Sequence, residues 1–584
     1  MTDTLMHVDR EDLLVLGRSL TREWLETDGR GGYASSSVLM CATRRYHGLL
    51  VAPPPGSANR HVFLSRFEET FHGGGKSFAI SLARYPGHWG PHGHQGLEAF
   101  DLRPNPCWTY VFGRARLERE VLAAKGQHTV LVRYRVTGQQ NPVELRLRPL
   151  LACRDAHHLT HENLEADTRA TRIEGGVSAR PYGALPAVSI TLSTRARFEA
   201  DPVWYKRVEY QSDLARGYDG HEDNLSPGWF EVPIANGVDV YVAATIGSPV
   251  RDPAALWALE KAARARVLEG FEPGVRDLLA ATADDFLYRT EKGRLGVIAG
   301  YPWFGEWGRD AYISLPGLLL ARDRVDECRQ ALEGALAFVR DGLLPNVFGA
   351  GVADSAYNSV DASLWFARAV RLYDLAAGDG AGRRFRGALE DIAGRYLAGT
   401  DLCRGDPESG LLRAGDTRSN VTWMDAMTAD GPVTPRDGFA VEINALWCFL
   451  LAYLEDLARR DGDERAARGW GSLKRRAGAA FVERFWLPEE KHLADVWKDG
   501  VADASVRPNM VIAASLEWSP LSRGMRTDVV RRATATLLTP FVLRTLEPHH
   551  PAYRGRYGGT LQDRDSAYHQ GTVWPWLIGP YARR

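Results

Sequence analysis

Residues 438–485, GFAVEINALWCFLLAYLEDLARRDGDERAARGWGSLKRRAGAAFVERF, decide the fold of the second half of this chain. Apolar side chains recur at helical spacing through 438–459 and again through 464–485, which predicts two helices. A short connection rich in Asp and Gly separates them, so the chain reverses there and the helices are expected to pack as a hairpin. The stretch therefore favours an all-helical architecture built from such hairpins.

The helical period covers most of the chain after about residue 270. Long loops, such as 401–437 and 538–568, alternate with short ones and hold Gly, Pro, Asp and Trp. Helical hairpins with long loops on one side predict an (α/α)6 toroid of six hairpins, and the expected segments leave that toroid about two helices short. The expected helices are 273–292, 309–321, 324–341, 357–377, 381–400, 438–459, 464–485, 508–518, 522–537 and 569–584.

Before about residue 265 the apolar period is two, which is typical of strands. VLVRYRV (130–136), VELRLRPL (143–150), AVSITL (187–192) and VDVYVAATI (238–246) alternate or run β-branched, and Gly, Pro and Asn clusters separate them. Short strands with frequent turns predict an antiparallel β-sandwich. We therefore expect a β-sandwich domain over 1–267 and a helical domain over 268–584.

Composition excludes several classes of function. A formal net charge of -1 gives no electrostatic reason to bind nucleic acid. The N-terminus lacks the pattern of a signal peptide, and the apolar run LWCFLLAYL is far shorter than a membrane span. The 6 cysteines include no CxxC pair, so they suggest neither a zinc site nor a disulfide framework. The sequence predicts a cytoplasmic protein with no membrane or nucleic-acid partner, no metal and no cofactor.

Acidic residues stand beside aromatic residues in the expected loops of the second half. In YPWFGEWGRD (301–310), Asp310 opens an expected helix and either caps it or grips sugar hydroxyls. Arg309, Trp303 and Trp307 would share the second role. In YNSVDASLWF (357–366), Asp361 lies in a first helical turn, where either the helix dipole or a ligand explains it.

Asp425 follows Trp423 in the loop TWMDAMTADGPVTPRDG (422–438), away from any helix start. An adjacent indole would partly desolvate the carboxyl and raise its pKa, which favours a proton donor near neutral pH. The alternative is a turn residue. Glu442, in VEINALW, heads a helix and is either a cap or a sugar contact.

The segment YHQG opens the final expected helix. His569 and Gln570 at its start are either hydrogen-bond partners of ligand hydroxyls or helix residues without a chemical role. The sequence leaves both interpretations open.

Together with further segments, these motifs resemble, in order, those of the amylo-α-1,6-glucosidase type of glycogen debranching enzyme. The resemblance implies a β-sandwich followed by an (α/α)6 barrel that hydrolyses, with inversion, the α-1,6-linked glucose stub of a trimmed glycogen branch. It assigns Asp425 as general acid, Arg309 and Asp310 as holding the terminal glucose, and Asp361 and His569 as pocket residues. The further segments are EWLETDGRGGYASSS (23–37), TRRYHGLLVA (43–52), RPLLACRDAHHLTHEN (148–163), RPNM (507–510) and DSAYHQGTVWPW (565–576).

Inverting glycosidases need a second carboxyl about 6.5–9.5 Å from the acid to activate water. The resemblance places this general base in a Glu-containing loop beyond residue 584, so we expect weak activity from the chain as written. Glu442 or Asp437 could replace that base only if correctly positioned. The alternatives are a non-catalytic protein that binds glycogen or another branched α-glucan, and a hydrolase of another α-glucoside such as trehalose.

Overall fold

The computed structural model describes residues 5–139, 143–267, 269, 274–378 and 380–582. Its contacts divide the chain into two compact units, Met1–Gly305 and Glu306–Arg584. Two helices, α4 (Pro253–Val267) and α5 (Val275–Ala283), belong to the first unit. The compact units therefore divide later than the change of sequence period, and a domain boundary at 267/268 stays a prediction.

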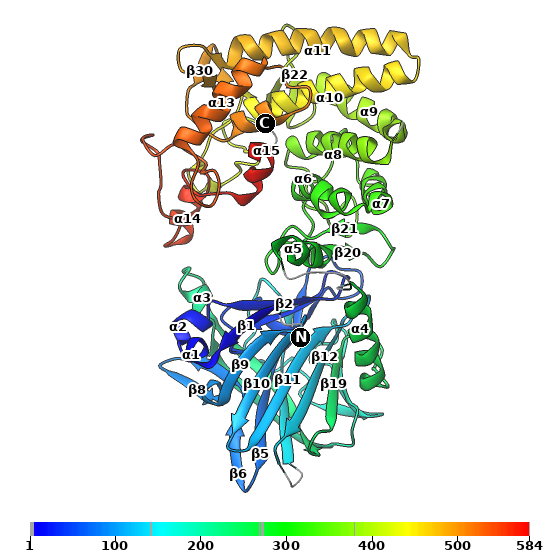
Figure 1. The fold of residues 1–584 in the computed structure, drawn as a ribbon, viewed down its shortest axis with the longest axis vertical. Coiled ribbons are helices and arrows are strands. Elements are labelled where there is room, and N and C mark those ends of the chain that lie inside the picture. The colour runs from blue at the N-terminus through cyan, green and yellow to red at the C-terminus, as the bar shows by residue number, and fades with distance from the viewer. Residues whose placement is uncertain (1–4, 140–142, 268, 270–273, 379, 583–584) are drawn as a thin grey trace. The chain divides into compact units, whose positions relative to one another are not determined.

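The first unit contains two large antiparallel sheets (Figure 1). One has eight strands, ordered β17 (Arg197–Glu209), β18 (His221–Ile234), β13 (Val143–Asp155), β5 (His61–Gly73), β4 (Gly48–Ala52), β3 (Tyr33–Ser37) and β2 (Glu23–Thr27), with β6 (Lys76–Ala79) also on β5. The other has nine, ordered β1 (Met6–Asp9), β9 (Leu97–Leu102), β10 (Pro106–Phe112), β11 (Ala115–Ala123), β12 (Thr129–Thr137), β19 (Asp239–Thr245), β16 (Val188–Leu192), β15 (Gly176–Ala179) and β14 (Ala170–Ile173).

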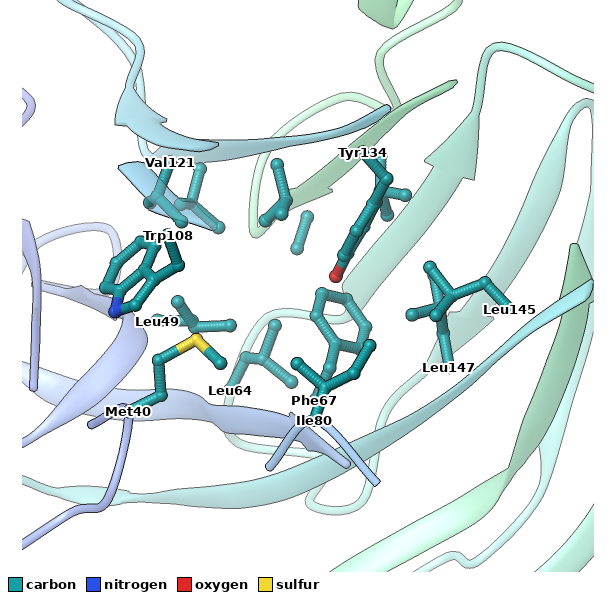
Figure 2. Close-up of a cluster of buried hydrophobic side chains, with 14 of the residues drawn as sticks. Met40, Leu49, Leu64, Phe67, Ile80, Trp108, Val121, Tyr134, Leu145 and Leu147 are labelled. Carbon is teal, nitrogen blue, oxygen red and sulfur yellow. The ribbon is translucent and has the colours of Figure 1, made fainter. Parts of the chain in front are cut away.

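The core of this unit is formed by side chains from both sheets. Trp108 and Tyr134 come from the nine-stranded sheet, and Phe67 and Leu145 come from the eight-stranded sheet, in one buried cluster (Figure 2). Alternate residues of each strand supply this layer, because successive side chains of a strand point to opposite faces. The predicted antiparallel β-sandwich is confirmed, and each of the four quoted strand segments forms a strand.

The second unit is helical. Its helices are α6 (Gly308–Leu318), α7 (Val325–Leu336), α8 (Asp361–Ala377), α9 (Arg386–Ala398), α10 (Val441–Arg460), α11 (Glu464–Phe485), α12 (Asn509–Ser515), α13 (Arg523–Thr536), α14 (Leu561–Tyr568) and α15 (Ile578–Ala582). Helices α10 and α11 lie side by side as the predicted hairpin (Figure 1). Asp463 ends the connection between them by accepting a hydrogen bond from Ala466 N, which caps α11.

Two predicted helices are wrong in extent. The final one, expected over 569–584, is reduced to a single 3₁₀ turn at Pro575–Leu577 and the short helix α15, and residues 583–584 lie outside the described part. Thr560 and Asp563 form a capping box that starts α14 inside an expected loop. The helix expected over 273–292 ends early because its second half forms β20 (Leu287–Arg289), which pairs with β21 (Leu295–Val297).

Across the described residues, no helix has the length and apolarity to cross a membrane.

Candidate active site

Arg309 occupies the first turn of α6, and its surroundings explain its fixed position. The helix can start here because Gly308 packs on the carbonyl oxygen of Pro345, where a Cβ would lie only 2.2 Å away. The buried Arg309 guanidinium donates from Nε to Asp361 Oδ2 at 2.7 Å and from Nη2 to Oδ1 at 2.9 Å. This two-pronged ion pair ties the start of α6 to the start of α8, since Asp361 is the first residue of α8.

The same guanidinium also reaches Asp425. Its Nη1 lies 3.3 Å from Asp425 Oδ2, so Arg309 bridges the carboxylates of Asp361 and Asp425. Burial raises the pKa of Asp425, the nearby Asp361 charge adds to that rise, and Arg309 opposes it. The Asp425 side chain is still 33% exposed, so a ligand can reach it. The loop therefore presents a carboxyl that holds its proton more strongly than an ordinary Asp does.

Asp310 follows Arg309 on α6 and keeps access to solvent. Enclosure by the surrounding protein raises its pKa, while the charge of Arg309 lowers it. The negative charges of Asp361 and Asp425 add to the rise in the pKa of Asp310. Arg309, Asp310, Asp361 and Asp425 thus form the polar centre that the sequence predicted from three separate segments.

His569 lies in an aromatic cluster beside this centre. Its ring stacks on Trp574 at 5.4 Å and meets Trp423 edge-on at 5.3 Å. Burial lowers its pKa to about 3, and the positive charge of Arg309 acts in the same direction. The imidazole is therefore neutral, and neither ring nitrogen has a hydrogen-bond partner in the described structure. It follows the end of α14 instead of starting a helix, which corrects the sequence expectation.

A second buried network lies behind the loop of Asp425. Arg436 pairs with Glu442, through Nη2–Oε2 at 2.6 Å, and with Asp495, through Nε–Oδ2 at 2.9 Å. Asn509 links Asp495 to Trp423: its Nδ2 donates to Asp495 Oδ1 and its Oδ1 accepts from the indole Nε1, both at 2.7 Å. The network fixes Trp423, two residues before Asp425.

Two predicted sugar contacts are engaged by buried arginines. Glu442 is fully buried with Arg436, so a sugar could reach it only if that ion pair opened. The Gln570 side chain accepts from Arg507 Nη2 at 2.8 Å and donates to Val433 O at 3.1 Å. Their roles as sugar contacts stay predictions. Sequence reasoning gave no role to Arg436, Asp495, Asn509 or Arg507, although the motif RPNM pointed to two of them.

Comparison with known proteins identifies the family. The sequence model described as Amylo-alpha-1,6-glucosidase matches residues 281–584, more than half of the chain. The chain belongs to the amylo-α-1,6-glucosidase family. The model described as Glycogen debranching enzyme N terminal matches residues 22–241, which adds the β-sandwich to this assignment and confirms the resemblance noted from the motifs.

Two individual proteins define how far the likeness extends. The Glycogen debranching enzyme of Saccharomyces cerevisiae is 27% identical over 385 residues, covering 49% of this chain and 25% of the yeast protein. The chain thus spans a quarter of that relative. A solved bacterial glucoamylase in complex with acarbose superimposes with a TM-score of 0.55 at 9% identity, over 99% of this chain and 85% of the glucoamylase. This likeness confirms the predicted fold class.

Two tryptophans predicted as sugar contacts, Trp303 and Trp307, belong to different units of this family member. Trp307 precedes α6 in the second unit and forms a β-bridge with Val347. Trp303 belongs to the first unit, where the guanidinium of Arg44 lies 5.2 Å from its ring. Asp437, considered above as a substitute base, pairs with Lys498 Nζ at 2.7 Å.

Proposed function

We propose that this family member hydrolyses α-1,6-linked glucose at the branch points of glycogen or a related cytoplasmic α-glucan, with inversion at the anomeric carbon. The observation that carries the proposal is the bridge from Arg309 to Asp361 and Asp425, with a raised pKa on Asp425. A raised pKa keeps a carboxyl protonated near neutral pH, as a general acid requires.

In the proposed reaction, Asp425 donates its proton to the glycosidic oxygen as the bond from that oxygen to the anomeric carbon breaks. Water attacks the opposite face of that carbon and gives its proton to a second carboxyl. The products are free glucose and a glucan with one branch fewer. Arg309 keeps Asp425 in place through their 3.3 Å contact and limits the rise of its pKa.

The terminal glucose would lie against residues already gathered at the centre. Asp310, with solvent access, would accept hydrogen bonds from sugar hydroxyls. His569 is neutral and buried, and neither ring nitrogen has a partner among the described residues, so it would donate one hydrogen bond to the sugar and accept another only where the ligand displaces the atoms that cover it. The indole ring of Trp423 forms an apolar wall beside His569.

The experiment measures glucose released from a phosphorylase-trimmed branched dextrin, with maltoheptaose and trehalose as comparison substrates. The proposal predicts release from the dextrin at a higher kcat/KM than from either comparison, with β-glucose formed first in the proton NMR spectrum. Preferential release from trehalose or from the linear chain would overturn the assigned linkage. Binding of the dextrin without release from any substrate would favour a non-catalytic glucan-binding protein.

A further inference from the structure

A cluster of partly exposed rings lies in the first unit. It consists of Arg44, Tyr46, His157 and Trp303, which we call the ring platform. Tyr46 meets Trp303 at 6.5 Å and 69°, and it meets His157 at 5.5 Å and 77°. The guanidinium of Arg44 lies over the Trp303 ring, 5.2 Å from the ring centroid. Three distant chain segments thus converge on one surface.

The ring platform is held rigidly by hydrogen bonds. Tyr46 Oη contacts His157 Nδ1 at 3.1 Å, and Tyr46 O accepts from the hydroxyl of Tyr33 at 2.7 Å. Arg44 Nε donates to Glu23 Oε1 at 2.7 Å. Tyr46 packs against the buried cluster of Tyr33 and Val51, but it and Trp303 stay partly exposed and His157 is exposed, so core packing accounts for only part of their surface. Rigid, exposed aromatic groups lose little conformational entropy when a ligand binds.

The charges of the ring platform favour a neutral ligand. Glu23 neutralises Arg44, and Asp213 neutralises the adjacent Arg45 across 3.5 Å. Burial lowers the pKa of His157, which keeps its imidazole uncharged at neutral pH. The surface therefore combines flat rings and hydrogen-bonding groups without net charge, a combination that matches sugars better than phosphates or acidic peptides.

We propose that the ring platform, whose residues are distinct from those of the polar centre around Asp425, binds a chain of an α-glucan. The C–H face of a glucose unit would lie on Trp303, and its hydroxyls would exchange hydrogen bonds with Tyr46 and His157. The choice of ligand rests on the proposed function. A polymer held at two sites binds more tightly than at one, because the second contact forms within an existing complex.

The test measures retention of the full chain in native gels containing glycogen, together with calorimetric titration by maltoheptaose. All variants carry Asp425→Asn, so that the glucan is not consumed. Trp303→Ala and Tyr46→Ala are expected to weaken glycogen binding about tenfold, as loss of a central aromatic contact does. Trp303→Phe keeps a flat ring and is expected to retain most of the affinity, which separates lost stacking from lost folding.

The matched control is Trp229→Ala in the same unit. The guanidinium groups of two arginines, Arg146 and Arg148, lie 4.9 and 4.7 Å from the centroid of the Trp229 ring, whereas the Trp303 ring has one such neighbour among the described residues, Arg44. The affinity of the Trp229→Ala variant for glycogen should change less than twofold. Unchanged retention of Trp303→Ala and Tyr46→Ala, or an equal loss in Trp229→Ala, would overturn the ring platform. Glucose release by the parent chain tests the proposed function separately, because retention does not depend on catalysis.

Discussion

At the scale of single residues, the sequence predicted which acidic residues are candidates for the site, but not the ion pairs that they form. The position of Asp425 after an indole predicted a desolvated carboxyl, and burial does raise its pKa. The bridge by Arg309 could not be predicted, because it joins residues 52 and 116 positions apart through the tertiary fold. The resemblance assigns His569 to the pocket, which stays a prediction, whereas the helix start expected at this residue is wrong because His569 follows the end of α14.

The first prediction concerns the charge of Asp361. Because that charge raises the pKa of Asp425, Asp361→Asn should lower it and move the alkaline limb of kcat/KM to lower pH. Ser359→Ala is the control, since it removes a 2.6 Å hydrogen bond to Asp361 and a 3.3 Å bond from Ala362 N but keeps the charge of Asp361. The measurement is the dependence of kcat/KM on pH for each variant, with branched dextrin as the substrate. An unmoved limb in Asp361→Asn, or a limb at higher pH, would contradict the proposed coupling.

The second prediction concerns His569 and stability. Its pKa in the folded state is about 3, below the ordinary 6.5, so the unfolded chain binds the extra proton between these values. The contribution of His569 to the free energy of unfolding is therefore fully present above pH 6.5. As the pH drops toward 3, this contribution falls by up to about 1.4 kcal/mol per pH unit. His569→Phe should lose less stability than the parent in urea unfolding between pH 7 and 4.

For that comparison the exposed His158 provides the control, because its side chain is 78% exposed. His158→Phe should follow the parent at every pH. Parallel curves for the parent and His569→Phe would show that the neutral buried imidazole contributes nothing to the pH dependence.

At the scale of elements, the bounds of long helices with a strong apolar period were predicted well. The short helix α14, which begins at a capping box, was not predicted. The hairpin of α10 and α11 has long apolar faces, and its predicted bounds agree closely with the observed ones. Helix α14 has almost no apolar face, so periodicity could not reveal it. Its T-x-x-D capping box was the available signal, and it lay inside a stretch interpreted as a loop.

The third prediction concerns the ion pairs of Arg436, which join the start of α10 to the segments of Asp495 and Trp423. Arg436→Met leaves Glu442 and Asp495 without their common partner and should destabilise the helical unit by about 3–5 kcal/mol. Arg395→Met should cost under about 1 kcal/mol, because Arg395 and Asp391 are both more than half exposed. Urea unfolding followed by helical circular dichroism compares them, and equal midpoints would refute a stabilising role for this network.

The fourth prediction concerns the start of α14. Thr560→Ala removes one half of the capping box and should weaken the helix by about 1 kcal/mol. Amide hydrogen exchange should become faster within α14 and stay unchanged in α13. Thr527→Ala, inside α13, is the control because its hydroxyl makes only a bond within its own helix. Unchanged exchange in α14 would mean that tertiary contacts, and not the cap, hold this helix.

At the scale of the whole molecule, the change of sequence period predicted the order of architectures correctly. Alternation in strands and helical spacing in hairpins record which faces are buried, so a sandwich followed by helical hairpins could be inferred. The separation into compact units at 305/306 could not, because it depends on contacts that no local pattern encodes. Trp303 and Trp307, predicted from one motif, accordingly belong to different units.

The central claim is that Asp425 is the general acid of an α-1,6-glucosidase. The measurement compares Asp425→Asn with the parent on two substrates, branched dextrin and α-glucosyl fluoride, whose fluoride leaves without protonation. The account predicts a loss of about 10²–10⁴-fold on dextrin with most activity on the fluoride retained. Equal losses on both substrates, or no loss on dextrin, would contradict it.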